Sequence, residues 1–95
     1  MATLRPVEAE TLAVRALAWM AADAEMTGRF LALSGAGPAE LRARAAEPEF
    51  LGFVLDFLLA DEAALVAFAA AEGAPPELVG RARAALPGGV PPHWT

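Results

Sequence analysis

Apolar residues recur along the chain three and four positions apart, in short blocks that glycine and proline separate. Residues at this spacing share one face of a helix, so the pattern is typical of amphipathic helices. The glycines and prolines divide the chain into six helical segments. We expect these helices over residues 6–22, 24–34, 38–46, 48–60, 61–72 and 75–86. The predicted fold is all-α, a compact bundle of five to six short helices.

The fourth segment, 48–60, is apolar on nearly every face. A weaker strip along it consists of Glu49, Gly52, Asp56 and Ala60. A helix with this pattern is expected at the centre of the bundle, where the other helices cover it. The predicted core consists of Leu17, Met20, Phe30, Phe53, Val54, Phe57, Leu58, Leu65 and Phe68. We also expect Leu33 and Val66 to face inward.

The ends of the second and fifth helices carry recognisable signals. Asp23 stands where a side chain can cap the second helix, and Asp61 begins the fifth. Gly35 and Gly73 follow the last apolar positions of these helices. We expect both glycines to have a positive φ, because helices often end on a left-handed residue that glycine adopts without strain.

The second half of the chain repeats these helix-start and helix-end signals at a shift of 38 residues. Under the shift, Asp23 aligns with Asp61, Phe30 with Phe68, Gly35 with Gly73 and Pro38 with Pro76. The match includes helix starts, helix ends and aromatic residues, which favours the duplication of a three-helix unit. Coincidence is the alternative, since chance matches are common in an alanine-rich chain.

Composition removes several classes of function. The chain has no cysteine and one histidine, so it offers no disulfide, no thiolate metal site and no zinc site built on histidines. Its one serine, Ser34, has no predictable histidine partner for a hydrolase triad. Paired carboxylates occur at helix starts, where acids are favoured for structural reasons. We therefore predict no catalytic residue, no cofactor and no metal.

The net charge of −5 argues against nucleic acid as a partner, because the phosphate backbone is also negative. One segment, Ser34–Leu41, resembles the glycine hairpin of helix-hairpin-helix DNA-binding proteins. Arg44, however, stands where that hairpin normally has an apolar residue. We interpret the glycines as a helix end followed by a helix that Pro38 begins.

No segment has the pattern of a membrane span or a signal peptide. The best candidate for a span, residues 50–71, is interrupted by Asp56, Asp61 and Glu62. Its apolar runs are shorter than the roughly 20 residues that a transmembrane helix needs. Glu8, Glu10 and Arg15 similarly interrupt the N-terminal apolar stretch. We expect no membrane partner and a cytoplasmic location.

The run GRFLALSGAGPAELRARAAEPEFLGFVLDFLLADE, residues 28–62, resembles a family of small alphaproteobacterial all-helical proteins classed as a domain of unknown function. The most recognisable pieces are GRFLALSG and VLDFLLADE, and the resemblance extends less sharply over nearly all of the chain. It implies a helical fold in a bacterial, cytosolic setting. It implies no activity, ligand or catalytic residue.

Three residues are candidates for interaction. Asp56 interrupts the most apolar stretch of the chain, and it lies either on a solvent-facing strip or buried against an arginine such as Arg15 or Arg29. Trp19 belongs either to the core or to a binding surface. Trp94 follows two prolines, and a solvent-exposed tryptophan is unusual enough to suggest an anchor for a partner.

We expect a single helical domain over residues 1–86, followed by a flexible tail rich in proline and glycine over residues 87–95. A chain this small cannot bury every large apolar side chain, so an apolar surface patch is expected. The sequence thus favours a non-enzymatic protein-interaction module that binds another protein or forms a homodimer. The alternative is a helical domain that binds or senses a small molecule.

Overall fold

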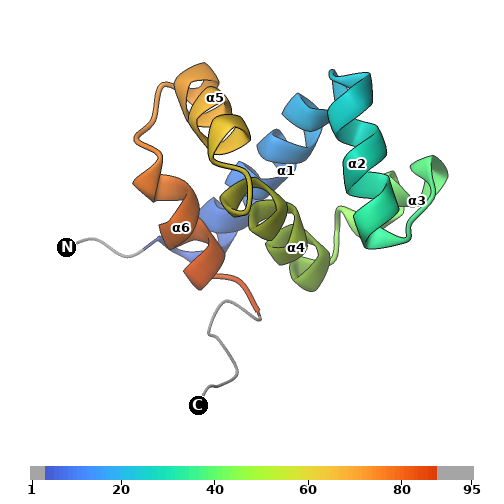
Figure 1. The fold of residues 1–95 in the computed structure, drawn as a ribbon. Helices are drawn as coiled ribbons and strands as arrows, with labels where there is room; N and C mark the ends of the chain where they lie inside the picture. The colour runs from blue at the N-terminus through green and yellow to red at the C-terminus, as the bar shows by residue number, and fades with distance from the viewer. Residues whose placement is uncertain (1–3, 88–95) are drawn as a thin grey trace, which may run out of the picture.

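The computed structural model describes residues 4–87 and places six α-helices in them, with no strand in that range. The helices are α1 (Pro6–Ala21), α2 (Ala24–Ser34), α3 (Pro38–Arg44), α4 (Pro48–Leu59), α5 (Glu62–Glu72) and α6 (Glu77–Ala84). They form one small bundle in which α4 crosses in front of α1 (Figure 1). The predicted all-α fold is confirmed. Pro75 and Pro76 precede α6 as a turn, so this helix begins later than expected.

The helix ends follow the local chemistry that the sequence indicated. The carboxylate of Asp23 accepts a hydrogen bond from the Met26 N–H at 3.0 Å, and that of Asp61 accepts one from the Ala64 N–H at 3.2 Å. Gly35 and Gly73 end α2 and α5 with φ of +73° and +68°. The predicted positive φ of both glycines is confirmed, because each residue adopts the left-handed conformation.

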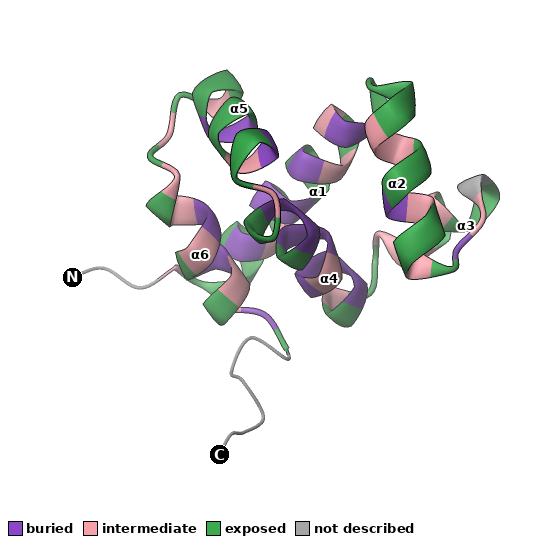
Figure 2. Cartoon of the chain, in the orientation of Figure 1, coloured by how far each residue is buried: buried purple, intermediate pink, exposed green. Residues whose placement is uncertain are grey.

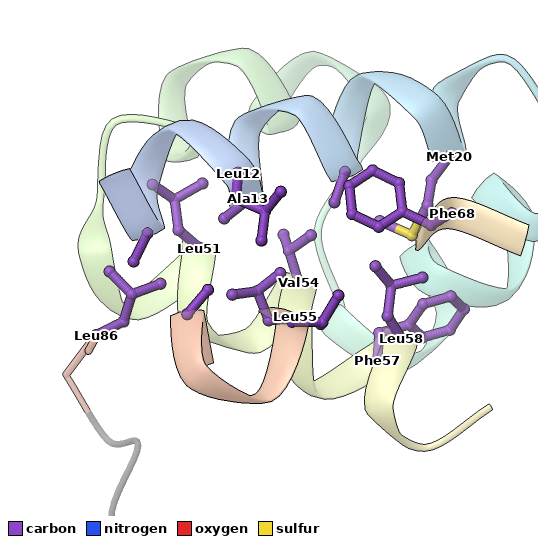
Figure 3. Close-up of a cluster of buried hydrophobic side chains, with 14 of the residues drawn as sticks. Leu12, Ala13, Met20, Leu51, Val54, Leu55, Phe57, Leu58, Phe68 and Leu86 are labelled. Atoms are coloured by element: carbon purple, nitrogen blue, oxygen red, sulfur yellow. The ribbon is translucent and has the colours of Figure 1, made fainter. Parts of the chain in front are cut away.

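Helix α4 lies at the centre of the core, as its apolar pattern predicted. Its buried residues are Phe50, Leu51, Gly52, Val54, Leu55, Phe57 and Leu58. Helices α1, α5 and α6 pack against it, and α1 also packs against α6 and α2 (Figures 1 and 2). Figure 3 shows side chains of α1 and α4 meeting along this contact, with Phe68 of α5 and Leu86 at its two ends.

Aromatic contacts tie α2 to α4. The ring of Phe30 lies 5.8 Å from that of Phe50, 5.4 Å from that of Phe53 and 5.3 Å from that of Phe57, measured between centroids. The contacts with Phe50 and Phe57 are edge-to-face, an arrangement that aromatic pairs favour. Phe30 therefore anchors α2 to α4.

Most of the predicted core is correct, and two inward orientations are wrong. Met20, Phe30, Val54, Phe57, Leu58 and Phe68 are buried, whereas Leu17, Phe53 and Leu65 are half-buried against them. Leu33 and Val66 are exposed, at 68% and 49%. Val66 lies two residues from Phe68, so it points away from the core once Phe68 points inward. Leu33 borders a shallow hollow beside Phe50 and Phe53 instead of entering the core.

The positions aligned by the 38-residue shift have the same structural roles in both halves. Asp23 and Asp61 both cap helices, and Phe30 and Phe68 are both buried. The two halves therefore share their helix starts, helix ends and inward aromatic positions. The duplication itself stays a prediction.

Gly28, which lies within α2, and Gly35, which ends it, should respond in opposite ways to substitution by alanine. Gly35→Ala should destabilise the fold by roughly 1 kcal/mol, because alanine is strained at positive φ. Gly28→Ala should stabilise it by about 0.5–1 kcal/mol, because Gly28 lies within the helix and an added Cβ would meet nothing within 4 Å. Urea denaturation of both variants measures the difference. Effects of the same sign would contradict the assigned end of α2.

Two residues of α5 provide a matched test of its orientation. Phe68→Ala should destabilise the protein by about 3–5 kcal/mol, because the side chain is fully buried. Val66→Ala should change the free energy of unfolding by less than about 0.5 kcal/mol, because the side chain is exposed. Thermal and urea unfolding check both values. A large loss of stability in Val66→Ala would mean that α5 is rotated from the orientation described.

Candidate functional site

A hollow of about 640 Å³ lies between α1 and the segment that contains α3. Its lining consists of Val14, Leu17, Ala18, Ala21, Ala39, Leu41, Arg42 and Ala45. Among these described residues Arg42 is the only charged one, and the rest are aliphatic. The hollow is therefore an apolar surface with a single cation at its rim.

A second hollow, of about 330 Å³, continues the first toward the start of α1. It is lined by Val7, Glu10, Thr11, Val14, Arg15, Ala45, Ala46 and Leu51. The two hollows share Val14 and Ala45. We call these two adjacent hollows together the α1–α3 groove.

Helix α1 supplies this groove because it is apolar on two opposite faces. One face is buried against the bundle and carries Ala9, Leu12, Ala13, Ala16 and Met20. The opposite face carries Val7, Thr11, Val14, Ala18 and Ala21, at alternating spacings of four and three. Residues at these spacings lie along one side of a helix. Val7 and Val14 are 58% and 42% exposed, so this side presents apolar surface to solvent.

Sequence reasoning missed this outer face. Glu8, Thr11 and Arg15 lie three and four positions apart, and this spacing indicates a polar, solvated strip on the helix. The signal that could have found the groove is the regular spacing of Val7 and Val14 with the alanines that follow them. That spacing is hard to notice because alanine occurs throughout the chain.

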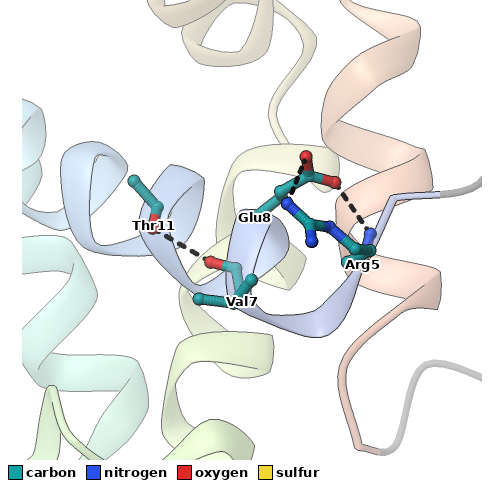
Figure 4. Close-up of polar contacts among 4 residues, drawn as sticks. All are labelled: Arg5, Val7, Glu8 and Thr11. Carbon is teal, nitrogen blue, oxygen red and sulfur yellow. Dashed lines mark hydrogen bonds and ion pairs between the residues drawn. The ribbon is translucent and has the colours of Figure 1, made fainter.

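The polar groups near the start of α1 are largely satisfied within the helix. Figure 4 shows Glu8 accepting hydrogen bonds from the N–H of Arg5 at 2.9 Å and from its guanidinium at 3.4 Å. The backbone hydrogen bond is the main cause that lowers the pKa of Glu8. The hydroxyl of Thr11 donates to the carbonyl of Val7 at 2.9 Å. The polar atom of Thr11 therefore needs no partner in the groove.

Two charges in the groove, by contrast, have no ion pair among residues 4–87. Arg15 is paired with Glu72 at 2.7 Å, and this hydrogen bond raises the pKa of Arg15. Glu10 and Arg42 take part in none of the ion pairs that the described residues form. Glu10 lines the smaller hollow and Arg42 the larger one. The groove thus has an unpaired anion toward one end and an unpaired cation toward the other.

Asp56 lies on the solvent-facing strip of α4, with 49% of its side chain exposed. The solvent-facing placement is confirmed, and the alternative of burial against Arg15 or Arg29 is wrong, because Arg15 pairs with Glu72 and Arg29 with Asp61. The partner of Asp56 is Arg83 of α6, whose Nε and Nη2 donate to the carboxylate at 2.6 and 3.1 Å. Sequence alone could not find this pair, because the two residues are 27 positions apart.

Arg83 joins three segments of the chain. Its side chain is only 13% exposed, and its Nη1 donates to the carbonyl of Pro87 at 2.9 Å. Gly52 provides the space for it, because a Cβ at that position would lie 2.6 Å from Nη1. We call Gly52, Asp56, Arg83 and Pro87 the Arg83 clasp. The charge of Asp56 is thus engaged inside the chain, where it holds α6 on α4.

The other candidates are explained by packing or lie outside the described residues. Trp19 is half-buried, and its ring centroid lies 5.6 Å from that of Phe68, which favours its interpretation as a core residue. Trp94, and most of the predicted tail, lie outside the described residues. Ser34 donates to the carbonyl of Leu31 and accepts from the N–H of Ala36, so it takes part in the turn that ends α2.

Asp61, the first residue of the acidic pair at the start of α5, has a structural role. Asp61 accepts hydrogen bonds from the backbone of α5 and from Arg29. The bond from the Ala64 N–H is the main cause that lowers the pKa of Asp61, and Arg29 adds to it.

Within residues 4–87, no group of three or more metal-ligating side chains is present. None of the six helices is long and apolar enough to cross a membrane.

A double-mutant cycle tests the Arg83 clasp. Gly52→Ala should lower the free energy of unfolding by about 1 kcal/mol more in the parent than in an Arg83→Ala background. Only the parent has a guanidinium that the new methyl group displaces. Urea denaturation of the four chains gives the coupling. Gly28→Ala is the control, and its effect should be the same in both backgrounds. Additive effects of Gly52→Ala and Arg83→Ala would contradict the clasp.

Comparison with known protein families identifies the family of this chain. The sequence pattern of the family described as "Protein of unknown function (DUF3572)" matches residues 6–89, which are most of the chain. The chain therefore belongs to this family, which confirms the resemblance to a domain of unknown function. No curated protein and no solved structure matches it significantly.

Proposed function

We propose that this member of the DUF3572 family is a non-enzymatic protein-interaction module, and that the α1–α3 groove is its docking surface. The proposed setting is the bacterial cytoplasm, in keeping with the resemblance to alphaproteobacterial proteins. No catalytic role, cofactor or nucleic-acid partner is part of this proposal.

The observation that carries the proposal is the exposure of Val7 and Val14 along two adjacent hollows whose lining is mostly apolar. Burying apolar surface contributes about 25 cal/mol per Å², so a partner that covers both valines gains free energy. A contiguous apolar depression with charges at its edge is typical of surfaces that bind proteins. Its length along α1 suits the apolar face of a helix, which anchors through side chains three and four positions apart.

The shape of the groove favours a protein over a small molecule. Its larger hollow has a volume of about 640 Å³, within the roughly 300–1,000 Å³ range of ligand pockets. Small-molecule sites, however, combine apolar walls with several converging polar groups. In the described lining of the larger hollow, Arg42 is the only charged residue, and the hollow continues into the smaller one. This lining supports binding by apolar contact along a helix.

Two exposed valines permit a matched test of the docking surface. Val14→Arg places a charge in the groove, whereas Val66→Arg places the same charge on α5, away from it. Both positions are exposed to a similar extent, so both variants should keep the stability of the parent within about 0.5 kcal/mol. Protein partners captured from native cytosol should be lost with Val14→Arg and kept with Val66→Arg.

Equal capture by the two variants would contradict the groove as the docking surface. Native mass spectrometry of the purified chain provides the second readout. A small molecule that co-purifies with the parent and is lost in Val14→Arg would instead support the alternative function, binding or sensing of a ligand.

A further inference from the structure

We infer that the groove binds α1 of a second copy of the chain, laid antiparallel on α1 around a twofold axis near Val14. This inference rests on the proposed function, because it takes the α1–α3 groove as a docking surface. It goes further by identifying the partner.

The first step is the register of the two helices. In an antiparallel pair centred on Val14, residues equally far from Val14 in the sequence meet across the axis. Val7 of one copy then lies opposite Ala21 of the other, and Glu10 lies opposite Ala18. Ala18 and Ala21 both line the larger hollow. The exposed side chain of Val7 therefore reaches the larger hollow of the groove in the second copy.

The second step is charge. Arg42 lines the same hollow as Ala18, so Glu10 of one copy comes beside Arg42 of the other. Neither residue has an ion pair inside residues 4–87. The twofold axis forms the Glu10–Arg42 pair twice, once at each end of the interface. Arg15, the other cation of the groove, is already paired with Glu72 at 2.7 Å and does not compete for Glu10.

The groove is thus complementary to itself, which favours a second copy over other occupants. The segment 88–95 of the same chain contains no aspartate or glutamate, so it has no acidic side chain that could pair with Arg42. Each copy carries a net charge of −5, and the two reciprocal pairs offset part of the repulsion between the copies.

The size of the contact sets the expected affinity. Helix α1 has 16 residues, which corresponds to a length of about 24 Å. Two helices of this length, with the rims supplied by α3, give an interface at the low end of the usual size range, near 1,200 Å² in total. We expect a dimer with a dissociation constant on the order of micromolar, which releases monomer on dilution.

Charge reversal tests the inference on the purified full-length chain. Glu10→Arg and Arg42→Glu should each weaken the dimer at least tenfold in sedimentation equilibrium, because each places like charges together at both ends. The double variant Glu10→Arg/Arg42→Glu should recover the parent affinity. An equimolar mixture of the two single variants should form a heterodimer at least tenfold tighter than either homodimer, since both pairs are then complementary.

Glu25→Arg and Arg81→Glu are the matched controls, because both residues are exposed and take part in none of the described ion pairs. They should leave the dimer unchanged, singly and in a mixture. Circular dichroism should show that all variants keep the parent's helicity.

A parent chain that stays monomeric up to about 1 mM would overturn the inference, and so would a mixture that associates no better than its components. Either result leaves the proposed function standing if partner capture still depends on Val14. Loss of that dependence would instead remove the docking surface itself. The two failures are therefore distinguishable.

Discussion

Seven of the twelve residues of α4 are buried, so the neighbouring helices have to exclude water from more than one face of it. Helix α1 covers it along one side, α5 and α6 cover others, and α2 contributes Phe30 to the cluster around Phe50 and Phe57. The Arg83 clasp lies at the remaining strip, which stays solvent-facing at Asp56 and where Gly52 leaves space for a guanidinium. The orientation of each outer helix follows from which of its residues faces α4.

This enclosure leaves one side of α1 uncovered. Within residues 4–87, the helices that surround α4 leave few others to cover the outer side of α1. The inner face of α1 is occupied by α4 and α6, and its outer face borders α3, which has only seven residues. The α1–α3 groove is the gap that such a short helix leaves. The apolar lining of the groove is therefore a consequence of how the core is packed. This lining allows a partner to bind there.

The sequence predicted those features of the fold that local chemistry determines. The starts and ends of α2 and α5 follow from Asp23, Asp61, Gly35 and Gly73, because caps and left-handed glycines act within a few residues. The central place of α4 follows from its composition. Orientation was harder to predict: Val66 was expected to face inward but is exposed, and α5 is rich in alanine, which says little about which side of a helix is buried.

The candidate site was predicted less well than the fold, for a related reason. The partner of Asp56 depends on how α6 crosses α4, which residue spacing within either helix does not encode. The groove depends on the distance between α1 and α3, and on Glu10 and Arg42 being left without partners while five other arginines form pairs within residues 4–87. An expected apolar patch could be inferred from chain length, but its place could not.

The two unpaired charges give the proposed interface a direction that its apolar part lacks. Contacts among valine and alanine side chains allow two helices to pair in parallel or antiparallel orientation, because apolar attraction is not directional. In a parallel pair around a twofold axis, Glu10 of one copy would lie beside Glu10 of the other, and like charges at an interface are unfavourable. The antiparallel pair replaces this repulsion with two attractions to Arg42. The apolar groove thus supplies affinity, and the position of Glu10 and Arg42 at its opposite ends selects the orientation.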